Sequence, residues 1–379
     1  MSPRVYLDWN ATAPLRPEAH VAMSAAMEIA GNPSSVHAEG RAARRLVEDA
    51  RERVAFAIGA KFDNVIFTSG GTEANALALT PGWTSAGRTF GRLIVSAIEH
   101  PSVLSGGRFP PSEIGHAPVT GDGVVDLEKL RTMLSAGGPA LVSIMLANNE
   151  TGAIQPVSEA AEIVHGAGGI LHVDAVQALG RVASDVAALG ADLVTLSAHK
   201  IGGPKGVGAL VICGHDLHMS SALIRGGGQE RNRRAGTENV AGIVGFGVAA
   251  RAACANMAAE ARHMRGLRDR LEAGLASIAG VTIFSSRVPR LPNTTLFALN
   301  GVRAETAVIA FDLEGIAVSS GAACSSGKVQ ASHVLAAMGV ARELAEGAIR
   351  LSTGYATQNG DIDRCLEAWR MLSGVLRKP

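Results

Sequence analysis

A carboxylate and a lysine follow two apolar, strand-like runs in the middle of the chain. Asp174 follows Ile170–Val173, with Gln177 at the next turn, and Lys200 follows Leu193–Leu196. In an open α/β sheet, ligands bind beyond the carboxyl ends of the strands, so we expect the two charged side chains to share one cleft. They suit pyridoxal phosphate (PLP), because the lysine forms a Schiff base with its aldehyde and the carboxylate pairs with its pyridine nitrogen. Taken alone, Lys200 would be interpreted as an ordinary surface lysine in a Gly-rich loop. Its expected proximity to Asp174 and Gln177 favours a role in binding the cofactor.

A glycine turn supplies a candidate phosphate site. Within Phe67–Asn75 a strand-like run ends, Gly70 and Gly71 turn the chain, and Thr72 begins a predicted helix. Unpaired N–H groups at the start of a helix bind phosphate well. Taken alone, the motif is equally compatible with an ordinary turn and a threonine N-cap.

A histidine and an arginine are further candidates. His100 follows the strand-like run Leu93–Ser96, where an imidazole can stack on a flat cofactor and move protons, although a lone histidine is more often structural. Arg350 lies inside the apolar run Ala348–Ser352 and must be paired if it is buried. A bidentate substrate carboxylate and a structural salt bridge are both open as its partner.

Cys324 stands in a segment, Ser319–Gly327, whose other side chains are all small, so its thiol has little steric cover. Nucleophilic attack would require its thiolate form. Cys213, Cys254 and Cys365 lie at a strand end or in helical patterns, and we interpret them as buried and inert. The four cysteines form no CxxC pair, so neither a structural metal nor a disulfide framework is expected.

Strand-like and helical segments alternate through the first two thirds of the chain, which predicts an open, mostly parallel α/β sheet. The predicted strands are Val65–Thr68, Leu93–Ser96, Leu141–Ala147, Ile170–Val173, Leu193–Leu196 and Ala209–Ile212, with helices at Glu39–Ile58 and Val157–Gly166. A long helical stretch, Val240–Ile278, then leads to a smaller α+β part. With 379 residues we expect two domains, residues 14–256 and residues 257–379 together with 1–13.

Composition limits the partners. The 35 Lys and Arg residues nearly balance 34 Asp and Glu residues, so no general positive field is available to hold nucleic acid. The N-terminus lacks the apolar core of a secretory signal, and the longest apolar run, Val240–Ala250, is too short to span a bilayer. We therefore expect no nucleic acid, no membrane and a cytoplasmic location.

Taken together, these segments resemble the cysteine desulfurases, which belong to the class V aminotransferases within the fold-type I PLP enzymes. The resemblance covers nearly the whole chain and rests on an ordered set of motifs. These are Tyr6–Pro14, Gly31–Ser35, Thr68–Glu73, Asn148–Gly152, His172–Gln177, Ser197–Lys200, Arg234–Thr237, the Cys324 segment and Arg350. The resemblance implies a large domain with a mostly parallel seven-stranded sheet and a smaller α+β C-terminal domain.

The resemblance also implies a role for each matching residue. Lys200 would carry PLP, Asp174 would pair with the ring nitrogen, Gln177 would bond the ring hydroxyl, and His100 would stack on the ring and shuttle protons. The remaining cofactor contacts would come from Gly71, Thr72, Asn149, Ser197, His199 and Thr237. Of these, Thr237 would reach the phosphate in the second subunit of a homodimer. Asn149 and Arg350 would hold the substrate carboxylate.

The implied reaction converts L-cysteine to L-alanine and leaves the sulfur on Cys324 as a persulfide, for iron–sulfur cluster assembly or other sulfur transfer. The implied partners are a second copy of the chain and a scaffold or other sulfur-acceptor protein, and Cys324 could serve as an iron–sulfur ligand during transfer. No resident metal is expected. Two alternatives stay open: another class V PLP enzyme, such as an aminotransferase or a selenocysteine or cysteine lyase, and a non-catalytic scaffold.

Overall fold

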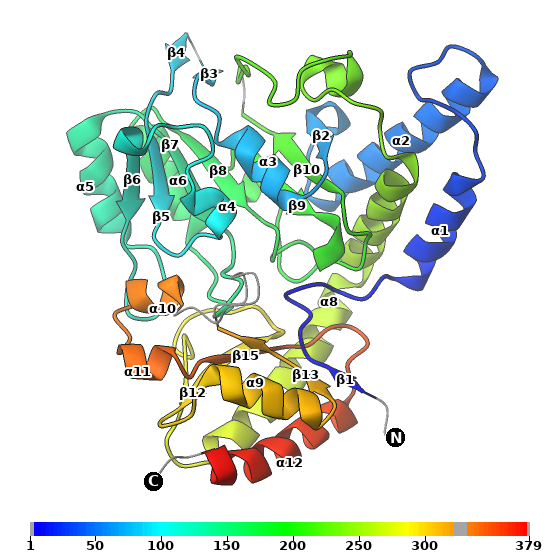
Figure 1. Ribbon diagram of the computed structural model, residues 1–379. Coiled ribbons are helices and arrows are strands. Elements are labelled where there is room, and N and C mark those ends of the chain that lie inside the picture. Colours follow the sequence, from blue (N-terminus) through cyan, green and yellow to red (C-terminus); the bar gives the residue numbers. More distant parts are fainter. Residues whose placement is uncertain (1–3, 86, 215, 322–331, 377–379) are drawn as a thin grey trace.

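The computed structural model describes residues 4–85, 87–214, 216–321 and 332–376. A larger part containing most of the first 250 residues lies above a smaller C-terminal part, and one long helix passes between them (Figure 1). Cys324 lies outside the described residues.

The larger part is built on a seven-stranded sheet with the order β2-β10-β9-β8-β7-β5-β6. The strands are β2 (Val65–Thr68), β5 (Leu93–Ser96), β6 (Ile114–Ala117), β7 (Leu141–Met145), β8 (Ile170–Asp174), β9 (Leu193–Ser197) and β10 (Gly208–Ile212). Strand β10 runs opposite to the other six strands of this sheet, which all point in the same direction. The predicted α/β class with a mostly parallel seven-stranded sheet is confirmed, and β6 is the strand that the sequence pattern missed.

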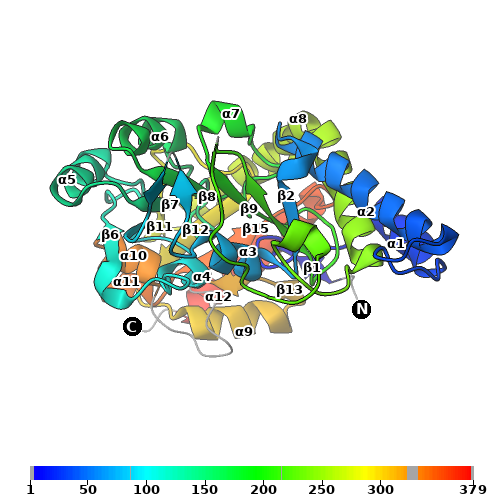
Figure 2. The same cartoon turned by 90° about the horizontal axis from the view of Figure 1, so that it is seen from above.

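Helices cover both faces of this sheet (Figure 2). The first face packs against α2 (Ala38–Ala57), α5 (Leu127–Gly137), α6 (Val157–Gly166), α7 (Val186–Leu189) and the first half of α8 (Val240–Ala276). The second face packs against α3 (Gly71–Ala78) and α4 (Pro101–Leu104). Burial on both faces explains why the strands are almost continuous apolar runs rather than alternating ones.

The smaller part contains a four-stranded antiparallel sheet with the order β11-β12-β15-β14. Its strands are β11 (Val281–Ile283), β12 (Thr294–Leu299), β14 (Ser319–Ser320) and β15 (Ile349–Ser352). One core joins it to α8, α9 (Ala304–Leu313) and α12 (Asn359–Leu376), and another joins it to α10 (His333–Ala337) and α11 (Arg342–Ala345). The other elements are α1 (Pro17–Met27), the β3–β4 hairpin (Thr84–Ser85, Arg88–Thr89), and the 3-10 turns η1 (Phe62–Asn64), η2 (Pro111–Glu113), η3 (Ala198–Lys200) and η4 (Gln229–Asn232).

Helix α8 belongs to both cores. Ile243 and Phe246 pack in the core of the larger part, whereas Leu267 and Leu271 pack in that of the smaller part. By length and composition alone α8 could cross a membrane, but half of its most apolar window is buried inside the protein, as in many core helices. The domain boundary predicted near residue 256 falls inside this helix and stays a prediction.

The N-terminal segment connects the two parts. Strand β1 (Val5–Tyr6) pairs in parallel with β13 (Ile316–Ala317), and this pairing buries Val5 and Leu7 in the core of the smaller part. The chain then runs past the sheet of the larger part before α1 begins. A single short segment thus contacts both parts of the molecule.

We predict that Leu7→Ala lowers the free energy of unfolding by about 2–5 kcal/mol, because Leu7 is fully buried and its truncation leaves a cavity. Chemical denaturation followed by circular dichroism measures the loss. Ile309→Ala is the matched control, because Ile309 is 57% exposed on α9 and should change stability by no more than about 0.5 kcal/mol. Equal effects of the two substitutions would contradict the assignment of Leu7 to the core.

Candidate active site

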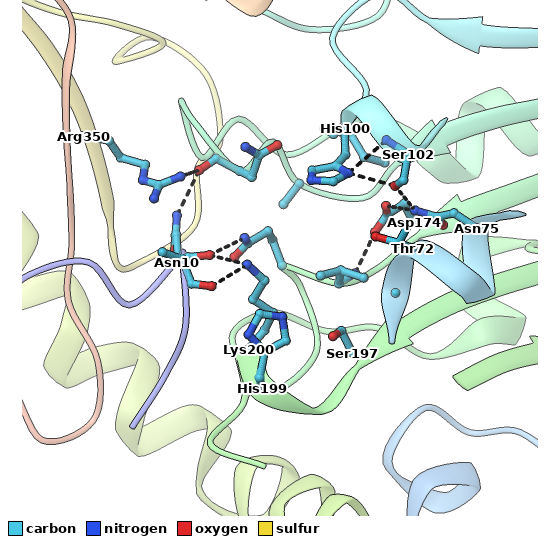
Figure 3. Close-up of a pocket in the computed structure, with 17 residues that line it drawn as sticks. Asn10, Thr72, Asn75, His100, Ser102, Asp174, Ser197, His199, Lys200 and Arg350 are labelled. Atoms are coloured by element: carbon cyan, nitrogen blue, oxygen red, sulfur yellow. Dashed lines mark hydrogen bonds between the residues drawn. The ribbon is translucent and has the colours of Figure 1, made fainter. Parts of the chain in front are cut away.

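A cavity of about 260 Å³ lies beyond the carboxyl ends of β8 and β9 (Figure 3). Of the predicted site residues that the structure describes, all except Thr237 line it, namely Gly71, Thr72, His100, Asn149, Asp174, Gln177, Ser197, His199, Lys200 and Arg350. The structure therefore brings together residues that are far apart in the sequence.

Lys200 ends the 3-10 turn η3 that directly follows β9. Its Nζ donates hydrogen bonds to the backbone oxygens of Asn10 (2.6 Å) and Ala11 (2.9 Å). These two carbonyls belong to the N-terminal segment, which thus holds the amine at the cavity wall. The sequence motif Tyr6–Pro14 contained both residues but gave no indication of this contact.

Asp174 is the last residue of β8 and is buried. Its Oδ2 accepts a hydrogen bond from Asn75 Nδ2 at 2.9 Å, and its Oδ1 accepts one from the N–H of Val176 at 3.0 Å. A carboxylate fixed in this way can pair with a protonated ring nitrogen. Asn75 reaches it from α3 and was not singled out from the sequence.

His100 begins α4 from the N-cap position. Its Nδ1 accepts the N–H of Ser102 at 3.1 Å and lies 2.8 Å from the Ser102 hydroxyl oxygen. Burial lowers the pKa of His100. The negative charge of Asp174 opposes this shift, whereas electrostatic repulsion by Lys200 and by His333 adds to it. At neutral pH the imidazole is therefore mainly neutral, the form that can accept a proton.

One end of the cavity combines small and hydroxyl-bearing residues. No side chain caps the first turn of α3, where Gly71 and Thr72 line the cavity together with Ser197 and His199. A Cβ on Gly71 would lie 3.1 Å from Val176 Cγ2, so only glycine fits there without displacing a neighbour. Burial, with the positive charges of Lys200, Lys205 and Arg181, lowers the pKa of His199 to about 4.

Arg350 lies across the cavity from Thr72 and Ser197 (Figure 3). It is 1% exposed on β15, and its Nη2 pairs with Asp8 Oδ1 at 2.7 Å while its Nη1 donates to the backbone oxygen of Asn149 at 3.0 Å. Its Nε is buried without a partner among the described residues. The structural salt bridge foreseen as an alternative is thus present, and it uses only part of the guanidinium, since two of its five N–H groups make these bonds.

Arg181 supports the cavity from behind and was missed in the sequence. Its Nη1 donates to both the backbone oxygen and Oε1 of Gln177, and its Nη2 donates to the backbone oxygen of Lys200 at 3.1 Å. Burial, together with the charge of Arg350, lowers its pKa to about 10, so it stays charged at neutral pH. Because Arg181 occupies Oε1, Gln177 presents its amide nitrogen, which donates to Asn10 O at 3.0 Å. The four-residue spacing of Gln177 and Arg181 was the available sequence signal.

Thr237 and the three described cysteines do not line this cavity. Thr237 lines a separate cavity beside Phe67 and Arg234, so its predicted contact with the cofactor of a second subunit stays a prediction. Burial raises the pKa of Cys213 and of Cys365 to about 12, which makes both thiols unreactive. Cys365 is buried as predicted, whereas Cys213 and Cys254 are only partly buried. In the described part of the chain, no group of three His, Cys, Asp or Glu side chains could hold a metal ion.

Sequence and structure comparisons identify the family. The class-V aminotransferase family matches residues 5–365, and this chain belongs to it. It is 44% identical to a cysteine desulfurase IscS of Dictyoglomus turgidum over 100% of this chain and 96% of that protein. It is 45% identical to a cysteine desulfurase of Cereibacter sphaeroides over 99% and 97% of the two chains. A NifS-like protein from Rickettsia africae superposes with a TM-score of 0.90 at 36% identity, covering 98% and 99% of the chains.

The family depends on PLP, and the residues of the cavity fit this cofactor. An amine and a carboxylate lie at neighbouring strand ends, an imidazole lines the same cavity, and an uncapped helix start carries Gly71 where a Cβ would be crowded. The sequence prediction of PLP as cofactor is therefore confirmed at the level of the family, while the contact of each residue with it stays a prediction.

A second buried carboxyl group belongs to Glu99, the residue that precedes His100. Glu99 is buried, its Oε1 accepts hydrogen bonds from Ser96 Oγ (2.6 Å) and the Met145 N–H (2.7 Å), and its Oε2 has no partner among the described residues. Burial raises its pKa to about 8; the two hydrogen bonds oppose this shift, and Asp174 adds to it. Glu99 is therefore mostly protonated at neutral pH.

We predict that Glu99→Gln flattens the pH dependence of stability between about pH 5 and pH 8. In wild type the unfolded chain ionises Glu99 near 4.5 and the folded chain only near 8, so stability falls as pH rises through this window, by up to about 1.4 kcal/mol per pH unit. The glutamine imitates the protonated acid and removes this slope. Urea denaturation at several pH values measures it, with the exposed Glu113→Gln as the control for the loss of one carboxyl group. Parallel curves for wild type and Glu99→Gln would contradict a protonated Glu99.

Proposed function

We propose that this chain is a PLP-dependent cysteine desulfurase that converts L-cysteine to L-alanine and transfers the sulfur to Cys324. The observation that carries the proposal is that full-length likeness to proteins named cysteine desulfurase coincides with one cavity that gathers Lys200, Asp174, His100 and Arg350. A further structural relative, described as SspA in complex with cysteine, superposes with a TM-score of 0.75 at 26% identity.

The cavity residues divide the work of holding PLP. Lys200 would attach the cofactor, Asp174 would pair with the ring nitrogen, and the amide nitrogen of Gln177 would donate to the ring hydroxyl. The first turn of α3, with Gly71 and Thr72, would hold the phosphate together with Ser197 and His199. When bound, PLP withdraws electrons from the substrate α-carbon and thereby weakens the bond between Cβ and sulfur.

Arg350 and Asn149 would orient the substrate at the opposite end of the cavity. The Arg350 guanidinium is held in place by Asp8 and by the Asn149 carbonyl, and its remaining N–H groups would donate to an α-carboxylate. Orientation by these groups would place the α-proton near the Lys200 amine and the imidazole of His100, which line the same cavity.

Sulfur transfer needs no external oxidant. The Cys324 thiolate attacks the substrate sulfur, a bond between the two sulfur atoms forms, and the bond between Cβ and sulfur breaks. The electron pair of the broken bond stays with the carbon skeleton, which takes up a proton at Cβ to become alanine. The described residues nearest to Cys324 in the chain bond to neighbours of residues that line the cavity. Gly321 N donates to the backbone oxygen of Ala348, two residues before Arg350, at 2.8 Å, and the Ser332 hydroxyl donates to Glu150, the residue after Asn149.

We further propose a homodimer in which Thr237 completes the phosphate site of the second copy. The persulfide on Cys324 would pass to an iron–sulfur scaffold or another sulfur-acceptor protein in the cytoplasm, and Cys324 could ligate iron transiently during that transfer. Analytical ultracentrifugation of the holoenzyme tests the dimer.

Two other functions make different demands on the chain. An aminotransferase or a selenocysteine or cysteine lyase of the same family would use Lys200 and Asp174 without requiring Cys324. A non-catalytic scaffold would not bind PLP and would show no visible absorbance band after PLP is added.

We predict that Cys324→Ala lowers the rate of alanine release from L-cysteine at least about 1,000-fold, because the nucleophile that accepts sulfur is lost. Alanine quantification and mass spectrometry of the trapped protein persulfide measure the two products. Cys254→Ala, a partly buried cysteine on α8, is the matched control and should retain wild-type turnover. Equal alanine release by Cys324→Ala and wild type would refute the proposed sulfur transfer and leave PLP binding intact.

A further inference from the structure

A continuous line of hydrogen bonds joins Asp174 to His100 on the α3 side of the cavity (Figure 3). Asn75 Nδ2 lies 2.9 Å from Asp174 Oδ2 and 2.9 Å from the Ser102 hydroxyl oxygen. The Ser102 oxygen in turn lies 2.8 Å from His100 Nδ1. Asn75 and Asp174 are buried and Ser102 is partly buried, so water has limited access to this line.

The two ends of the line fix the direction of every bond in it. The ionised form of Asp174 can only accept, so the Asn75 amide must turn its NH₂ group toward the carboxylate, and its second N–H then points at the Ser102 oxygen. At the other end, the backbone N–H of Ser102 can only donate, and it points at His100 Nδ1. Nδ1 of the neutral ring is therefore an acceptor, and the Ser102 hydroxyl also donates to it.

From this geometry we infer that Asn75 and Ser102 are positioning residues that fix neutral His100 as the tautomer protonated on Nε2 and couple it to Asp174. His100 then meets the ligand with a ring N–H, while its basic lone pair is held by two donors of residue 102. Taking up a proton at Nδ1 would require both donors of Ser102 to turn away, so the line also stabilises the neutral ring.

The inference rests on the proposed function and narrows the role of His100 in it: a neutral ring held in this way offers an N–H to the ligand, which leaves the Lys200 amine to take up the α-proton. Among the residues that the structure describes, the charged and titratable groups found to act on its ring are Asp174 at the end of β8, Lys200 on η3 and His333 on α10. None of these changes when Ser102 is replaced. The effect of the hydroxyl can therefore be separated from the surrounding charges.

Nitrogen-15 NMR of the holoenzyme labelled at its histidines tests the inference directly. The chain has 11 histidines, and loss of a signal in His100→Gln assigns the one that matters. We expect wild-type His100 to show the pattern of a ring protonated on Nε2 and to titrate below its ordinary range. A ring protonated on Nδ1 would overturn the inference, and because the readout does not involve sulfur release, it can fail while the proposed function stands.

Substitutions at residue 102 test the hydroxyl. Ser102→Ala should raise the titration midpoint of His100 by about 0.5 to 1 pH unit, the size expected when one hydrogen bond to the neutral ring is lost. Ser102→Thr keeps the hydroxyl and should restore the wild-type midpoint. Ser105→Ala removes an exposed hydroxyl at the end of the same short helix and should leave the midpoint unchanged. An unchanged midpoint in Ser102→Ala would refute the role of the hydroxyl.

A double-mutant cycle tests the coupling through Asn75. Asn75→Leu removes both amide donors and should shift the titration midpoint of His100 when it is the only substitution. The shift that Asn75→Leu causes should be smaller in the Ser102→Ala variant. Additive shifts would mean that Asn75 acts on His100 through space, and the proposed line between Asp174 and His100 would be wrong.

Discussion

The whole site depends on the fact that strands β7, β8 and β9 are buried on both faces. A strand in this position can carry chemistry only where it ends, because a charge in its interior would need a partner in the core. His172 is a titratable residue inside β8, and it is kept neutral there because burial lowers its pKa to about 4. Its ring nitrogens are satisfied by Ser143 and Thr195 on the two adjacent strands. Asp174 and Lys200 lie at the end of a strand or just beyond it, so the parallel arrangement gathers them at one edge of the sheet.

The N-terminal segment adds the second constraint. Leu7 is locked into the core of the smaller part, and three residues later the carbonyls of Asn10 and Ala11 accept the Lys200 amine. Between them, Asp8 pairs with Arg350 on β15. The amine from the larger part and the guanidinium from the smaller part are therefore both held by one short stretch of chain, which limits how far they can separate across the cavity.

Much of this arrangement was predictable from the sequence because the signals are local. Apolar runs marked six of the seven large-sheet strands within a few residues, and strand ends marked Asp174 and Lys200. The pattern failed at β6, where a glycine and a histidine break the apolar run Ile114–Ala117. It also missed Asn75, Ser102 and Arg181, because their roles depend on partners brought close only by folding. Local spacing cannot show that an amide on α3 meets a carboxylate on β8.

The charges around the cavity explain which ligands it favours. Lys200, Arg181 and Arg350 are positively charged in or directly behind the cavity, whereas Asp174 and Asp8 are negatively charged and Glu150, whose pKa burial raises to about 7, is only partly ionised. Glu99 does not correct this excess, because burial keeps it mostly protonated at neutral pH. Arg181 in particular forms no ion pair with any carboxylate in the described part of the chain, and its bonds go to neutral oxygens of Gln177 and Lys200. A buried positive excess of this kind is stabilised when an anion enters, so the cavity is suited to a ligand with a phosphate at one end and to a substrate carboxylate at the other.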